Sequence, residues 1–228
     1  MKQIGCLHAH HSNIQFTERI FTDLPIKASH FVDPGLIHFL KNNTDTCQLS
    51  KRIVNELKWI EKTGVDMILI TCTNYITLLE HIKLNINIPV LKIDEPFFEE
   101  IKQTSRPVQV MFTNEGTVAG TMGRLHNYLR GQISFPIEYE VIPKAFDLYM
   151  HGKTTEHDQH LSEFLVNQDF KKQTIAVAQL SMSNAAIEYS NKNKQFIINP
   201  LSAMKNHLLK HLNSEEKKSQ HAAASKKT

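Results

Sequence analysis

Hydrophobic and polar positions along this chain follow two alternating patterns. Short apolar runs, which are typical of buried strands, alternate with stretches in which apolar residues recur every three or four positions, as on one face of a helix. The clearest helical stretch is 48–64, which ends at a glycine, a common helix stop. Its apolar stripe is formed by Leu49, Ile53, Leu57 and Ile60.

The same two patterns predict strands and helices over most of the chain. Strands are predicted at 3–7, 28–33, 67–71, 88–93, 107–113, 137–143, 174–180 and 195–199. Helices are predicted at 34–41, 48–64, 94–103, 155–168 and 200–212, and from about residues 74, 117 and 181. Strands that alternate with helices imply mostly parallel sheets with helices on both faces, which is an α/β fold.

The order of these elements is similar before and after about residue 105. We therefore expect two pseudo-symmetric, Rossmann-like lobes, residues 1–104 and 105–199, with a cleft between them. The helix at 200–212 is expected to pack back on the first lobe. The polar segment 213–228 has few core-forming residues, so we expect it to be disordered.

Charge and composition narrow the function. The formal net charge is +3, and the tail 213–228, with four lysines and two glutamates, supplies +2 of it. The folded part therefore lacks the concentrated basic surface that nucleic-acid binding needs. No apolar run approaches the ~20 residues that span a bilayer, and no signal-peptide pattern opens the chain, so we expect a cytoplasmic protein without a membrane partner.

The three cysteines, Cys6, Cys47 and Cys72, are odd in number and widely spaced. This set does not suit a disulfide framework, and it contains no Cys-x-x-Cys pair of the kind that holds structural zinc. A special cysteine in this chain is therefore expected to be a free thiol with a chemical role.

Small polar or reactive residues follow several predicted strands. In parallel sheets flanked by helices, ligands bind beyond the carboxyl ends of the strands. The residues at those ends are His8 to Ser12, Cys72 to Asn74, Thr113 to Thr117, and Gln179 to Ser181. This coincidence is the main indication of a site.

Cys72 stands at a strand-to-helix turn, where Thr73 or Asn74 can cap the helix. The N–H groups and dipole of a helix start favour an anion, and they also lower the pKa of a thiol. The segment would then place a reactive sulfur beside a cradle for a carboxylate. On this stretch alone, a small buried cysteine beside a plain cap is the better interpretation.

Two other loops allow a chemical interpretation. The loop 113–117 resembles a phosphate loop only weakly, because the Gly-Lys-Ser/Thr ending is missing, and an ordinary connection capped by Thr117 is about as well supported. His8, His10 and His11 form a histidine cluster that suggests a metal. Adjacent histidines in a short loop rarely converge on one ion, so we expect a metal-free loop in which His8 faces the cleft.

Several of these segments together resemble the aspartate/glutamate/hydantoin racemase superfamily. The segment 64–95, GVDMILITCTNYITLLEHIKLNINIPVLKIDE, is similar to that superfamily's first cysteine segment. The likeness extends from about residue 3 to 212 and includes IGCLHAHHS, VDPGLI, VQVMFTNEGT and IAVAQLSMSNAA. The resemblance implies two α/β lobes with the active site between them, chemistry without a cofactor or metal, and a homodimer.

The resemblance also assigns site residues. Cys72 matches the first catalytic cysteine, which exchanges the substrate α-proton with a second cysteine on the opposite face. The positions matching substrate-binding groups are Thr73, Asn74, Thr113 and Thr117, together with Ser12 in the first loop.

The second catalytic cysteine is missing from this pattern. Gln179 occupies its position, and Ser181 two residues later is no proton donor at neutral pH, although both remain candidate substrate-binding residues. Since a glutamine is neither acid nor base, two-thiol racemisation is not expected. Cys72 would act alone as base or nucleophile, and a thiolate–imidazolium pair with His8 would suit the second role.

Three classes of function remain open. The first is a racemase-like isomerase on a small carboxylate, dicarboxylate or amino acid, with Cys72 as base. The second is a single-cysteine lyase, isomerase or hydrolase with Cys72 as nucleophile. The third is a carboxylate-binding protein without turnover.

Overall fold

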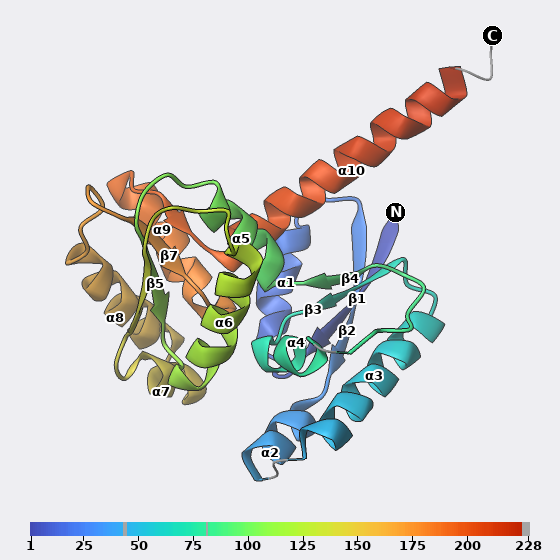
Figure 1. Cartoon of the computed structure of the whole chain (residues 1–228), viewed down its shortest axis with the longest axis horizontal. Coiled ribbons are helices and arrows are strands. Elements are labelled where there is room, and N and C mark those ends of the chain that lie inside the picture. The colour runs from blue at the N-terminus through green and yellow to red at the C-terminus, as the bar shows by residue number, and fades with distance from the viewer. Residues whose placement is uncertain (43–44, 81, 225–228) are drawn as a thin grey trace.

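The structure, a computed structural model, describes residues 1–42, 45–80 and 82–224 and contains two parallel sheets (Figure 1). The first sheet has the order β2-β1-β3-β4 and the second the order β6-β5-β7-β8. The first comprises β1 (Lys2–His8), β2 (Ile26–Val32), β3 (Met67–Ile70) and β4 (Val90–Lys92). The second comprises β5 (Val108–Phe112), β6 (Ile137–Val141), β7 (Thr174–Val177) and β8 (Ile197–Ile198). The shared order confirms the predicted α/β architecture of two pseudo-symmetric lobes.

Helices connect the strands and flank both sheets (Figure 1). They are α1 (Asn13–Phe21), α2 (Pro34–Asn42), α3 (Thr46–Lys62), α4 (Thr73–Leu79), α5 (Asp94–Lys102), α6 (Val118–Leu129), α7 (Ala145–Met150), α8 (Thr154–Val166), α9 (Ser183–Asn193) and α10 (Pro200–Ala224), with short 3-10 turns η1 (Glu115–Thr117) and η2 (Leu180–Met182). The sequence patterns predict all of these helices except α1 and α7. The structure does not describe residues 43, 44, 81 and 225–228.

Side chains of β1 alternate between two helical layers. Gly5 faces α3, and a Cβ at this position would overlap the side chain of Ile60, so β1 lies directly on that helix. Successive strand residues point to opposite faces. Cys6, which follows Gly5, and His8, two residues further on, therefore point to the other face, where α1 packs.

α5, which lies within the predicted first lobe 1–104, packs in the hydrophobic core of the second lobe. Phe97, Phe98 and Ile101 of α5 are fully buried in the hydrophobic core of the second lobe. These residues form the apolar face of α5, and this face packs against the side chains of β5 and β8. α10 follows the second lobe in the chain but packs on the first lobe, because its Leu201 and Leu208 belong to the core of the first lobe.

The end of the chain also differs from the sequence prediction. α10 runs to Ala224, although disorder was expected from residue 213. Its last turns project away from the body of the protein (Figure 1). Glutamate, lysine, glutamine and alanine are good helix formers, so this segment continues the helix that packing starts.

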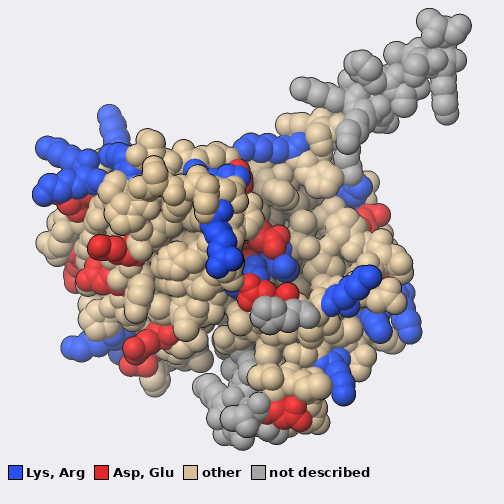
Figure 2. Space-filling model, viewed as in Figure 1, with Lys and Arg blue, Asp and Glu red and all other residues tan. Residues whose placement is uncertain are grey.

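Charged side chains of both signs are interspersed on the face shown in Figure 2. Among the described residues, no helix combines the length and the apolar character that a bilayer crossing needs.

Candidate functional site

The candidate site is built at the central strands of each sheet. β1 and β3 are neighbours in the first sheet, and β5 and β7 hold the same places in the second. In α/β folds, ligands bind where loops leave such paired strands toward opposite faces of the sheet. The η2 turn after β7 reaches the first lobe, because Leu180 belongs to that lobe's core. The η2 turn, which carries Ser181, therefore lies where the two lobes meet.

Cys72 follows β3 and is the N-cap residue of α4. The backbone N–H groups of Tyr75 and Asn74 lie near its sulfur and lower the thiol pKa. Burial acts in the opposite direction and is the larger effect, so the pKa of Cys72 rises to about 11. The prediction of a thiol pKa lowered by the helix start is therefore wrong for the free protein.

The residues after Cys72 also differ in detail from the prediction. Neither Thr73 nor Asn74 caps α4, since both lie inside its first turn. Both are half-buried beside the cysteine, and the Thr73 carbonyl accepts a hydrogen bond from the Thr77 hydroxyl at 2.9 Å. They stay at the helix start, where a carboxylate would be favoured.

His8 does not form the predicted pair with Cys72. Its side chain is fully buried, with Nδ1 at 2.9 Å from Thr71 Oγ1 and Nε2 at 2.9 Å from His30 Nδ1. Burial, and then the neighbouring His30, lower the pKa of His8 to about 3. A neutral ring with both nitrogens engaged cannot act as an imidazolium partner for the thiolate.

The remaining first-loop residues are arranged locally. His10 Nδ1 lies 2.8 Å from the hydroxyl of Ser12, which is the N-cap residue of α1. Asn13, the first residue of α1, donates through Nδ2 to Thr71 Oγ1 at 3.3 Å. Asn13 links the first loop to the segment beside Cys72, and the sequence analysis did not single it out.

Gln179 is fastened to the end of β5. Its Oε1 accepts hydrogen bonds from the backbone N–H and the hydroxyl of Thr113, at 2.7 and 2.9 Å, and from the N–H of Asn114 at 3.1 Å. Its Nε2 donates to Thr117 Oγ1 at 3.4 Å. The structure thus brings three predicted binding residues together, but they bind one another. Donors that would hold a ligand anion in the second lobe are already satisfied by the glutamine.

Two serines follow Gln179. Ser181 is half-buried in η2. Ser183, which the sequence analysis did not select, is fully buried at the start of α9, and its hydroxyl has no hydrogen-bond partner among the described residues. A buried donor without a partner is unusual and is a candidate ligand contact. Its only signal in the sequence is its place in the first turn of a helix that follows a strand end.

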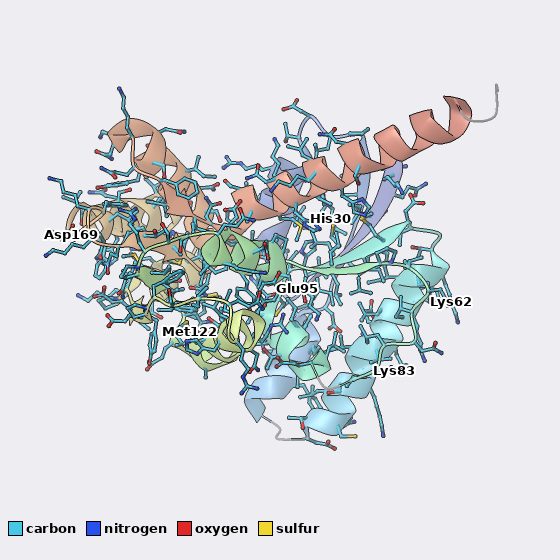
Figure 3. The ribbon with its side chains drawn as sticks, turned by 45° about the horizontal axis from the view of Figure 1, so that its top comes forward. His30, Lys62, Lys83, Glu95, Met122 and Asp169 are labelled. Atoms are coloured by element: carbon cyan, nitrogen blue, oxygen red, sulfur yellow. The ribbon has the colours of Figure 1, made fainter. Side chains whose placement is uncertain are left out.

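An ionic cluster joins the two lobes beside this region. Arg124 of α6 donates from Nε and Nη2 to the carboxylate of Asp94, at 2.8 and 3.1 Å. Only 7% of the Arg124 surface and 5% of the Asp94 surface are exposed. Arg124 also approaches Glu80 at the end of α4 at 3.9 Å and Glu95 at 3.8 Å. Glu95, at the start of α5, is labelled in Figure 3.

Solved structures with the same overall fold include racemases and an isomerase. An aspartate racemase from Picrophilus torridus superposes with a TM-score of 0.73 over 92% of this chain and 94% of its own, at 13% identity. The glutamate racemase isoform RacE1 from Bacillus anthracis gives 0.68 over 94% and 82%, at 15% identity. The chain has the racemase fold. No protein-family model and no curated protein matches the sequence.

The racemase fold is shared by an enzyme of a different reaction type. The maleate isomerase from Pseudomonas putida S16 superposes with a TM-score of 0.61 over 93% of this chain and 92% of its own, at 10% identity. These identities show the racemase fold alone. They confirm the architecture that the sequence resemblance implied.

Proposed function

We propose that this chain is a cofactor-independent, racemase-like isomerase that acts on a small carboxylate or amino acid through Cys72. The observation that carries the proposal is the position of the Cys72 sulfur. It lies at the carboxyl end of β3, beside the switch between β1 and β3, and next to the backbone N–H groups that begin α4. The racemase fold supports the assignment of this strand end as the reaction centre.

A substrate carboxylate would bind at the start of α4, next to the half-buried Thr73 and Asn74. In the free protein, the raised pKa keeps Cys72 protonated at neutral pH. The ammonium group of an amino-acid substrate beside Sγ would favour the thiolate, because an opposite charge stabilises it. The substrate itself would thus bring the pKa of the Cys72 thiol toward the working pH, where a general base is most effective.

Gln179 limits the reaction to chemistry on one face of the substrate. It cannot give or take a proton, and its Oε1 is held by Thr113 and Asn114. With Cys72 alone, removal and return of a proton occur on the same face, so exchange with solvent should be faster than inversion.

A second candidate reaction, favoured by Gln179, needs no proton donor on the opposite face. The Cys72 thiolate adds to one carbon of the double bond of an unsaturated dicarboxylate. A C–S bond forms, the π bond breaks, and the electron pair moves into the carboxylate on the adjacent carbon. Rotation about the remaining single bond, followed by expulsion of the thiolate, gives the trans isomer with all atoms balanced.

The test is incubation in deuterium oxide, followed by proton NMR. Each enantiomer of aspartate and glutamate, as well as malate and maleate, would be supplied in turn. We expect deuterium at the α-carbon of one enantiomer, or conversion of maleate to fumarate without deuterium uptake. Cys72→Ser should abolish either reaction, while the exposed Cys47→Ser is the matched control that retains it.

The opposite result is equally clear. Stabilisation of the fold by one of these acids without exchange or isomerisation would identify a binding protein and refute the enzymatic proposal. Activity that persists in Cys72→Ser would refute the assignment of the thiol.

A further inference from the structure

A second cluster of reactive side chains lies in the first lobe, on the face of the sheet that α1 covers. Cys6 and His8 are two residues apart on β1, and so point to the same face. His30, labelled in Figure 3, is the register partner of Cys6 on the parallel strand β2, and this register places it on that face as well. The sulfur and one nitrogen of each histidine lie within 4.8 Å of one another.

The outer nitrogens of both rings are held by other groups. His30 Nε2 lies 2.7 Å from a carboxylate oxygen of Glu18 on α1, and His8 Nδ1 lies 2.9 Å from Thr71 Oγ1. Metal-binding histidines usually donate their second N–H to a carboxylate or another oxygen in this way, which fixes the ring and the tautomer.

This arrangement turns two nitrogens toward each other. The Glu18 carboxylate can only accept, so His30 donates from Nε2, and a neutral His30 ring keeps a lone pair on Nδ1. The Thr71 hydroxyl lies 3.2 Å from the carbonyl of Leu7 and can donate to it. His8 then donates from Nδ1 to Thr71, which leaves the lone pair of His8 Nε2 facing that of His30 Nδ1 at 2.9 Å. In this tautomer, a cation between or beside the two lone pairs would stabilise them.

We propose that Cys6, His8 and His30 bind one divalent transition-metal ion of the zinc class. Sulfur and imidazole nitrogen are the donors that zinc and its neighbours prefer. Bond lengths of about 2.0–2.3 Å at tetrahedral angles set the ligand atoms roughly 3.3–3.6 Å apart, so movements on the order of 1 Å complete the site. A water molecule would supply the fourth ligand.

Charge balance favours the same occupant. A metal-bound Cys6 is a thiolate, and Glu18 adds a second negative charge behind His30. Together they neutralise a divalent cation in a buried location, where an uncompensated charge would be costly. Without a metal, the Thr71 hydroxyl turns to His8 Nδ1, and His8 donates from Nε2 to His30.

The experiment is a cobalt titration of the full-length protein after removal of metals with a chelator. A cobalt–thiolate bond produces a near-ultraviolet charge-transfer band that histidines alone cannot produce. We expect this band to saturate at one equivalent of Co²⁺. Cys6→Ser should remove it, while Cys47→Ser and Cys72→Ser, which replace the other two cysteines, should retain it.

Histidine and carboxylate variants provide a second readout. We expect Zn²⁺ to raise the melting temperature of the wild-type protein, and His30→Gln to abolish the shift. Glu18→Gln should weaken metal binding about 10- to 100-fold. The exposed His126→Gln is the matched control and should behave as wild type.

Each alternative outcome overturns the proposal. A wild-type protein without the charge-transfer band holds no metal at Cys6. A band that survives in Cys6→Ser, or disappears in Cys72→Ser, places the metal elsewhere. If Cys6→Ser does not fold, a Zn²⁺ shift that persists unchanged in His30→Gln refutes the site.

Discussion

Replacing Arg124 by methionine should destabilise the protein strongly, because it leaves a buried carboxylate without its partner. Methionine retains most of the aliphatic length and removes the guanidinium, which donates two hydrogen bonds to Asp94. Hydrogen bonds to charged groups contribute about 1.5–3 kcal/mol each. Removing one partner of a buried ion pair costs about 3–5 kcal/mol. Two such bonds between residues that are both more than nine-tenths buried lead us to expect a loss in that range.

The assay is urea denaturation of four proteins: the wild type, Arg124→Met, Asp94→Asn and the double variant. The double variant should be more stable than the sum of the single losses implies, by about 2 kcal/mol, because it no longer buries an unpaired charge. Arg52→Met is the matched control. Arg52 is half-exposed and pairs with Asp33 and Glu56, so its loss should cost no more than about 1 kcal/mol.

The loss should also depend on pH in a defined direction. Burial raises the pKa of Asp94, although Arg124 partly offsets it. A carboxyl with a raised pKa in the folded state contributes stability below its unfolded pKa, and this is lost as the pH rises through the folded value. Without Arg124 the folded pKa rises further, so the variant's deficit should be smaller near about pH 5 than near pH 7.5. A deficit below about 1 kcal/mol, or one independent of pH, would refute this reasoning.

Three further predictions follow from local contacts. At roughly pH 8, Cys72 should be alkylated more slowly than a small thiol of pKa about 8.5. Its alkylation rate should rise tenfold per pH unit up to about pH 11. A plateau at lower pH would contradict the raised pKa. Gln179→Leu should lower the free energy of unfolding by about 1–3 kcal/mol, because it removes the acceptor of the Thr113 and Asn114 N–H groups after β5. Gln179→Glu keeps an acceptor there and should keep most of the stability. Equal losses in chemical denaturation of the two variants would contradict this. Gly123→Ala should stabilise α6 by about 0.5–1 kcal/mol. Gly120→Ala should stabilise the protein less or destabilise it, because its Cβ would lie 3.0 Å from Thr77 Oγ1 on α4. The melting temperatures of the two variants test this difference.

Hydrophobic periodicity was sufficient to predict the elements with regular patterns. α3 carries an unbroken apolar stripe, and the structure buries those residues. α1 was missed because its buried face includes a polar residue, Thr17, whose hydroxyl bonds within the helix to the carbonyl of Ile14 at 2.9 Å. α7 has only six residues, of which only Ala145 is buried, so it has no stripe to detect.

The position of the candidate site could be predicted from the sequence, but the contacts between its side chains could not. Strand ends can be inferred from sequence, which is why Cys72 and Gln179 were selected. The hydrogen bond between Gln179 and Thr113 joins residues 66 positions apart and depends on strand order and side-chain rotamers. The raised pKa of Cys72 depends on how deeply the turn is buried, and a dipole argument from the sequence omits that effect.

The exchange of helices between the lobes makes their folding interdependent. The core of the second lobe includes Phe97 and Phe98 from the first half of the chain, and that of the first includes Leu201 and Met204 from its end. A fragment cut near residue 104 would therefore expose an apolar helix face and lack part of its own core. Each lobe needs the other's segment to become stable, so the protein should unfold as one cooperative unit despite its two sheets.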